Sequence, residues 1–105
     1  MTNHTAVLTA LADPTRRAIF ERLARSPSAV GELARELPVS RPAVSQHLKI
    51  LKSAGLVTDQ AAGTRRVYSV DSAGVAAIRE YFEQFWQQSL ASFRTAARKP
   101  IQEER

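Results

Sequence analysis

The sequence predicts a mainly α-helical domain with one small β-hairpin, and three observations support this fold class. At 105 residues the chain fits a single domain. Apolar residues recur at helical spacing in successive segments, which are separated by capping residues, prolines and glycines. One stretch, residues 56–70, instead has two β-prone runs around a glycine-containing turn. We assign residues 1–98 to one domain and residues 99–105 to a flexible C-terminal tail.

The chain begins with two predicted helices. The first covers residues 4–12 and is too short to be stable alone. Asp13-Pro14 is typical of an N-cap followed by a first helical residue, so the second helix runs from there to about Arg25. Arg16 and Arg17 oppose the dipole of this helix, and we expect them to meet a carboxylate in a surface salt bridge or, as the alternative, an anion. The first helix carries three apolar residues at helical spacing: Val7, Leu8 and Leu11.

A pair of short helices follows the break at residues 26–28. The first is predicted over about residues 30–37, and the second begins after a tight turn at Pro38-Val39. Ser40 is a good N-cap, Pro42 falls in the first turn, and Gly55 supplies a common left-handed end. Two short helices joined by about three residues form a helix-turn-helix unit, in which the first braces the second across a groove.

The second helix of this pair has two different faces. Val44, Leu48 and Leu51 form one apolar stripe. The opposite face has hydrogen-bonding and cationic side chains and no carboxylate, whereas an ordinary solvated face mixes both signs. We interpret it as a DNA recognition face. Its residues are Arg41, Ser45, Gln46, Lys49 and Lys52.

The predicted hairpin lies directly after this helix, in the position of a wing. If Tyr68 faces the core, the alternation of a strand places Arg66 on the same side, near the tip, and Arg65 on the other. The two arginines are placed to reach phosphates or an adjacent minor groove. The alternative is a solvated hairpin tip without a DNA role.

A long last helix is predicted from Asp71-Ser72 to about Arg98. About 25 residues would extend about 38 Å, more than the width of so small a domain. Part of its apolar stripe is therefore left for a partner, and we predict a homodimer through the first and last helices, although the first half also suits an ordinary core helix. The predicted interface residues of the last helix are Phe82, Phe85, Trp86, Leu90 and Phe93.

Composition narrows the class of function. The net charge is +5. The basic excess lies within residues 1–70, which hold ten basic and five acidic residues, against five of each in residues 71–105. A basic surface attracts the phosphate backbone of DNA. The chain has no cysteine and no catalytic constellation, so we expect no enzyme and no cofactor. It also has no long apolar run and no recognisable signal sequence, so we expect a cytoplasmic protein without membrane contact.

Three segments resemble the ArsR/SmtB family of bacterial winged helix-turn-helix regulators. They are ADPTRRAIFERLA (12–24), VGELARELPVSRPAVSQHLKILKSAGLV (30–57) and GTRRVYSV (63–70). The resemblance covers about residues 5–95. It implies a winged helix-turn-helix fold, a homodimer built through the first and last helices, binding to an inverted repeat in a promoter, and release by an inducer.

This chain lacks the residues that the metal-sensing members of the family use for their two types of metal site. Their cysteine site lies on the helix before the recognition helix, and residues 32–37 contain no cysteine here. Another site type uses His and carboxylates on the last helix, yet the only histidines are His4 and His47. We expect His47 to be structural, His4 to offer at most an adventitious site, and the chain to hold no metal.

We therefore expect a repressor that binds double-stranded DNA as a homodimer. Arg41, Ser45, Gln46 and Lys49 would face the major groove, and Ser40 and Lys52 would contact phosphates. Pro42 lies in the same first turn, at the DNA-facing end of the helix. Two alternatives stay open: a winged helix that binds only protein, and a repressor that answers an unknown small organic ligand near Phe85 and Trp86.

Overall fold

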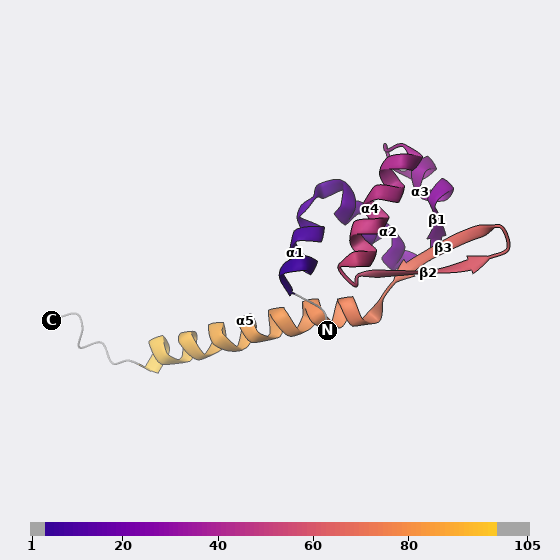
Figure 1. Cartoon of the computed structure of the whole chain (residues 1–105). Helices are drawn as coiled ribbons and strands as arrows, with labels where there is room; N and C mark the ends of the chain where they lie inside the picture. Colours follow the sequence, from indigo (N-terminus) through magenta and orange to yellow (C-terminus); the bar gives the residue numbers. More distant parts are fainter. Residues whose placement is uncertain (1–3, 99–105) are drawn as a thin grey trace.

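The computed structural model describes residues 4–98 and shows a winged helix-turn-helix domain from which one long helix projects (Figure 1). The predicted tail, residues 99–105, lies outside the described residues. The elements in chain order are α1 (His4–Ala12), α2 (Pro14–Arg25), β1 (Ser28–Ala29), α3 (Val30–Glu36), α4 (Arg41–Ser53), β2 (Val57–Ala62), β3 (Arg65–Val70) and α5 (Ser72–Arg98).

The helices begin and end where local chemistry predicts. The Asp13 carboxylate accepts a hydrogen bond from the Arg16 amide at 2.8 Å and caps α2. The Ser40 hydroxyl accepts from the Ala43 amide at 3.3 Å at the start of α4. Gly55 has a φ of 80°, the left-handed conformation that ends a helix with little strain in glycine. These signals confirm the predicted start and end of α4.

The core lies where α2, α3, α4 and the base of the sheet meet. The predicted stripe of α4 is fully buried, and it packs with Ile19 and Leu23 of α2 and with Leu33 of α3. Burial of each such side chain contributes roughly 1.5–3 kcal/mol. This burial fixes the rotation of α4 about its axis and so decides which of its residues face solvent.

The sheet has three strands rather than the two of the predicted hairpin. β1 pairs antiparallel with β3, with Ser28 opposite Tyr68, which gives the order β1-β3-β2. The sequence did not reveal β1 because it has only two residues and pairs with a strand far along the chain. The glycine-containing turn of the hairpin is short: Ala62 pairs with Arg65, so Gly63-Thr64 alone form the loop, with Gly63 at a φ of 66°.

α5 begins against the domain and then leaves it. Gly74 approaches the backbone at the end of α4 so closely that a Cβ there would lie 2.8 Å from the Leu56 Cα. Ala77 is buried and Ile78 packs against the core. Tyr81 lies edge-on to His4, with ring centroids 5.5 Å apart. Beyond this point the helix projects past α1 (Figure 1), as its predicted length required.

Candidate nucleic-acid interface

The exposed face of α4 carries every residue that the sequence selected on this helix. The buried stripe turns the opposite side outward, and no acidic residue occurs between Arg41 and Ser53. The face therefore offers cations and hydrogen-bonding side chains with no carboxylate from its own helix. The exposed residues are Ser40, Arg41, Pro42, Ser45, Gln46, Lys49 and Lys52.

One carboxylate joins this helix to the wing. Asp59 on β2 lies 2.8 Å from the Lys52 Nζ and 2.6 Å from the Arg66 Nε. The Asp59 side chain is only 6% exposed, whereas both cations are more than half exposed. The hydrogen bond from Lys52, together with the one from Arg66, holds the pKa of Asp59 below its usual value. The cluster keeps a net positive charge because two cations share one acid.

A second carboxylate holds the other side of the wing. Arg65 donates to Glu32 Oε1 at 2.8 Å, and the same oxygen accepts the Ala29 amide at 2.8 Å. The bond from the Ala29 amide is the main reason that the pKa of Glu32 is lowered, with Arg65 adding to it. Arg65 and Arg66 thus point to opposite faces of β3, as the predicted alternation requires. Each contacts a different neighbouring helix or strand of the domain.

Neither carboxylate is recognisable from the sequence, because each pairing depends on how separate segments of the chain fold together. Arg65 and Glu32 are 33 residues apart, and Arg66 and Asp59 are seven apart. The paired strands bring Asp59 to the position opposite Tyr68, on the same face as Arg66. The pairing of Asp59 with Arg66 therefore follows from the register of the hairpin, which the sequence does not show directly.

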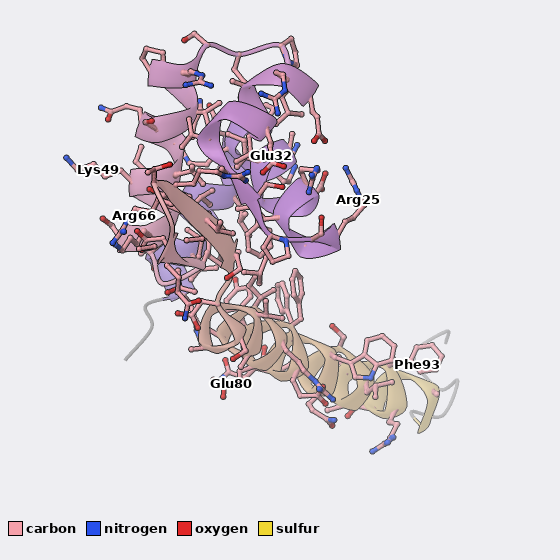
Figure 2. All side chains as sticks on the ribbon, turned by 90° about the vertical axis from the view of Figure 1, so that its right-hand side faces the viewer. Arg25, Glu32, Lys49, Arg66, Glu80 and Phe93 are labelled. Atoms are coloured by element: carbon pink, nitrogen blue, oxygen red, sulfur yellow. The ribbon has the colours of Figure 1, made fainter. Side chains whose placement is uncertain are left out.

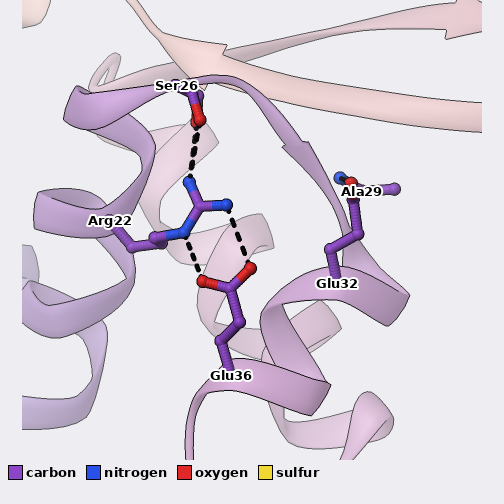
Figure 3. Close-up of polar contacts among 5 residues, drawn as sticks. All are labelled: Arg22, Ser26, Ala29, Glu32 and Glu36. Atoms are coloured by element: carbon purple, nitrogen blue, oxygen red, sulfur yellow. Dashed lines mark hydrogen bonds and ion pairs between the residues drawn. The ribbon is translucent and has the colours of Figure 1, made fainter.

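A fourth ion pair joins α2 to α3, the first helix of the helix-turn-helix unit. The Arg22 guanidinium binds Glu36 through two contacts, Nε to Oε1 at 2.6 Å and Nη2 to Oε2 at 3.1 Å (Figure 3). The remaining Nη1 donates to the Ser26 carbonyl at 3.0 Å. A fork of this kind restrains orientation as well as distance. It lowers the pKa of Glu36, chiefly through the hydrogen bond from Arg22.

Arg16 and Arg17 form no salt bridge with a carboxylate among the described residues, so that prediction is wrong, and the alternative of a bound anion stays a prediction. Arg16 Nε donates to the Ala10 carbonyl at 2.7 Å, and Arg17 Nη1 donates to the Leu11 carbonyl at 3.1 Å. Both arginines therefore bind carbonyls at the C-terminal end of α1, which otherwise lack helical partners. Arg16 Nη1 also lies 3.4 Å from His47 Nδ1, so the two side chains meet within the domain.

The other candidate surface is the apolar stripe of α5. Its large aromatic side chains Phe82, Phe85, Trp86 and Phe93 are all more than half exposed, and Phe93 reaches 71%. A hollow of about 450 Å³ on this helix is lined by Phe82, Phe85 and Trp86 with polar neighbours. Figure 2 shows Phe93 near the far end of α5, away from the body of the domain.

The predicted interface residues of α1 occupy different environments. Val7 is 1% exposed and belongs to the core of its own domain, whereas Leu8 is 38% exposed. Leu11 packs partly against the core, and Leu90 on α5 is intermediate in exposure. From α1, the available apolar surface therefore comes mainly from Leu8.

Within residues 4–98, no three side chains among His, Asp and Glu gather closely enough to hold a metal ion. Over the same residues, no helix combines the length and the apolar character that crossing a membrane requires.

Several known proteins that are similar to this chain in sequence and in shape are transcriptional regulators. Residues 11–60 match a family described as a helix-turn-helix domain. The HTH-type transcriptional regulator Rv2034 of Mycobacterium tuberculosis is 66% identical over 84 residues, which cover 80% of this chain and 78% of that protein. The HTH-type transcriptional repressor SmtB of M. tuberculosis is 50% identical over 59% of this chain, and the match spans 46% of its length. An ArsR-like transcriptional regulator from Rhodococcus sp. RHA1 superposes with a TM-score of 0.74 at 32% identity, covering 92% of this chain and 94% of that one.

Proposed function

The chain belongs to the ArsR/SmtB family of helix-turn-helix transcriptional regulators, and we propose that it is a homodimeric repressor that binds a pseudo-palindromic promoter site. The observation that carries this proposal is the exposed face of α4, which has three cations and no acid of its own and lies beside an arginine-bearing wing. Phosphate contacts give such a surface its affinity, and base-edge contacts give it specificity.

The residues of α4 divide into two proposed roles. Gln46 and Arg41 carry side chains able to pair bidentately with adenine and guanine edges, and Ser45 and Lys49 lie on the same face. Ser40 and Lys52 lie at the two ends of the helix, with Pro42 in the first turn, and to these positions we assign contact with the phosphate backbone. Arg65 and Arg66 on the wing would add backbone or minor-groove contacts while their carboxylate partners hold them in position.

The proposed dimer uses α1 and α5. The exposed aromatic stripe of α5 would be covered by the same stripe of a second chain, since a two-fold interface pairs identical patches. Two recognition helices related by such an axis would meet half-sites about one helical turn apart. The proposed interface comprises Leu8, Leu11, Phe82, Phe85, Trp86, Leu90 and Phe93, with Val7 supporting α1 from within the core.

Repression is proposed because a relative with half of its matched residues identical, SmtB, is named a repressor. Release by an unknown small organic molecule is a second proposal. The hollow beside Phe85 and Trp86 favours it, since apolar walls with Arg79 and Glu83 at the edge suit a small ligand of mixed polarity.

A fluorescence-anisotropy titration with the chain's own upstream intergenic DNA tests the function. Specific binding that weakens steeply with salt is expected. A winged helix that binds only protein would give no such binding, and that result would overturn the proposal. Shuffled DNA of the same length and composition is the control for specificity.

Two substitutions test the division of roles. Gln46→Ala should relax specificity at one base position and cost about 1–3 kcal/mol on the specific site. Arg66→Ala should weaken all sequences together and reduce the salt slope by about one. Identical behaviour of the two variants across specific and shuffled DNA would contradict these roles.

A further inference from the structure

A basic hollow of about 300 Å³ lies where α3, the start of α4 and the wing meet. Four arginines but only one carboxylate line it, so the charge of its walls is strongly positive. We call it the arginine pocket, and the residues that matter to the argument are Gly31, Glu32, Arg35, Arg41, Arg65 and Arg66.

Two guanidinium groups converge on one point of this pocket. The Arg41 Nη2 lies 2.6 Å, and the Arg35 Nη1 3.7 Å, from the position that a Cβ of residue 31 would take. Glycine at this position leaves the space that both groups approach. Neither arginine forms an ion pair with any residue in the described range 4–98.

The acids near the pocket are already engaged by other cations. Glu32 binds Arg65 and the Ala29 amide, and Asp59 binds Lys52 and Arg66. Neither Arg35 nor Arg41 therefore has a carboxylate in direct contact, although the charge of Arg35 contributes to lowering the pKa of Glu32 and of Glu36. Two like charges in close approach repel, so the arrangement gains stability from an anion placed between them.

We propose that the arginine pocket binds one phosphate group of the DNA backbone. This inference rests on the proposed function and deepens it. A planar guanidinium fork matches the oxygens of a phosphate, and the pocket adjoins both the first turn of α4 and the wing arginines. The inference gives a DNA contact to Arg35, which the sequence analysis did not select. It also assigns Arg41 to a phosphate rather than to a base edge.

Arg35→Ala with Arg25→Ala as control tests the proposal. Both substitutions remove one exposed arginine, but Arg25 projects from the other side of the domain from Lys49 and Arg66 (Figure 2). In anisotropy titrations over a range of salt, Arg35→Ala should weaken specific and shuffled DNA alike, by about tenfold, and should reduce the salt slope by about one. Arg25→Ala should leave the slope unchanged.

A charge-neutral variant and a modified DNA locate the contact. Gly31→Ala should displace the Arg41 guanidinium and weaken binding, with thermal unfolding confirming that the domain still folds. Methylphosphonate replacement of single phosphates should identify one position per half-site that weakens wild-type binding. The same replacement should cost Arg35→Ala no further affinity, because the two changes remove the same interaction.

The possible outcomes separate the two proposals. If the wild type binds its DNA specifically while Arg35→Ala matches Arg25→Ala in salt slope and methylphosphonate profile, the pocket inference is wrong and the proposed function stands. If the wild type binds no DNA, both fail. If inorganic phosphate shifts the Gly31 and Arg35 amide signals in an NMR titration while no methylphosphonate position depends on Arg35, the pocket binds a free ion, and the inference is likewise overturned.

Discussion

The recognition region and the outer half of α5 are stabilised in opposite ways. Around α4, apolar side chains are fully buried and carboxylates join the recognition helix and the wing to the rest of the domain. Along residues 82–98, the large aromatic side chains are more than half exposed, and Phe82 and Phe85 contact only the ring of Tyr81 on the same helix among the aromatic residues described. In the first region the sequence encodes a folded surface complete in itself, and in the second it encodes a surface that needs another molecule.

The largest expected effect is on the free energy of unfolding, which should fall when a side chain near α4 is truncated but not when one on the outer half of α5 is. Leu48 is 0% exposed and Phe93 is 71% exposed. Leu48→Ala should lower the free energy of unfolding by about 2–5 kcal/mol because it leaves a cavity in the core. Phe93→Ala should change it by less than about 0.5 kcal/mol at protein concentrations too low for association. Urea denaturation of both variants checks the contrast, and equal losses would contradict it.

The next effect concerns association. Phe85→Ser should weaken dimerisation by about thirtyfold or more, since truncating a central aromatic side chain of an interface costs about 2 kcal/mol or more. Sedimentation equilibrium measures the dissociation constant. The control is Gln84→Ser, which changes an exposed polar neighbour on the same helix turn. A dimer unaffected by Phe85→Ser would place the interface elsewhere.

Gly74 tests the junction between the two regions. A Cβ at this position would collide with the Gly55 carbonyl oxygen and lie 2.8 Å from the Leu56 Cα, both of which are backbone atoms. Gly74→Ala should therefore cost about 1–3 kcal/mol of stability, because α5 must move off the end of α4. The melting temperature of Gly74→Ala is compared with that of Ala73→Ser, a control variant at an exposed neighbouring position. An unchanged melting temperature would show that the backbones at residues 74 and 55–56 are not closely packed.

The smallest expected effect is a pH dependence of the free energy of unfolding, caused by Asp59, the carboxylate between α4 and the wing. The pKa of Asp59 is lowered in the folded state, first by the Lys52 hydrogen bond. Its contribution to stability is then fully present above the unfolded pKa of about 3.9 and is lost as the pH falls through the folded pKa.

Asp59→Asn should consequently destabilise the domain at pH 7 and make little difference in strong acid. Denaturation at both pH values measures this, with Glu21→Gln, an exposed acid outside the ion pairs of the described residues, as control. A stability difference that persists undiminished in strong acid would show that Asp59 acts through packing rather than charge.

Local signals predicted much of the fold. Ser40, Pro42 and Gly55 located α4 because caps and glycine ends depend on nearby residues alone. The two-residue strand β1 escaped prediction because its pairing with β3 is nonlocal. The packing of α2 against the end of α1 also gave Arg16 and Arg17 carbonyl partners in place of carboxylates.

The candidate site shows the same division. Helical periodicity predicted which residues of α4 would be exposed, since burial of Val44, Leu48 and Leu51 leaves only one face free. It could not place Arg35 beside Arg41, because they lie on different helices and meet over a glycine that leaves room for both. Nor could it foresee Asp59, whose role depends on strand register.

The most direct measurement is the mass of the protein–DNA complex by light scattering at low and high salt. The account predicts two 11.6 kDa chains on each duplex that carries the upstream site. It also predicts that the complex dissociates from the DNA as salt rises while the two chains remain together. One chain per duplex, or no complex at low salt, would contradict the account.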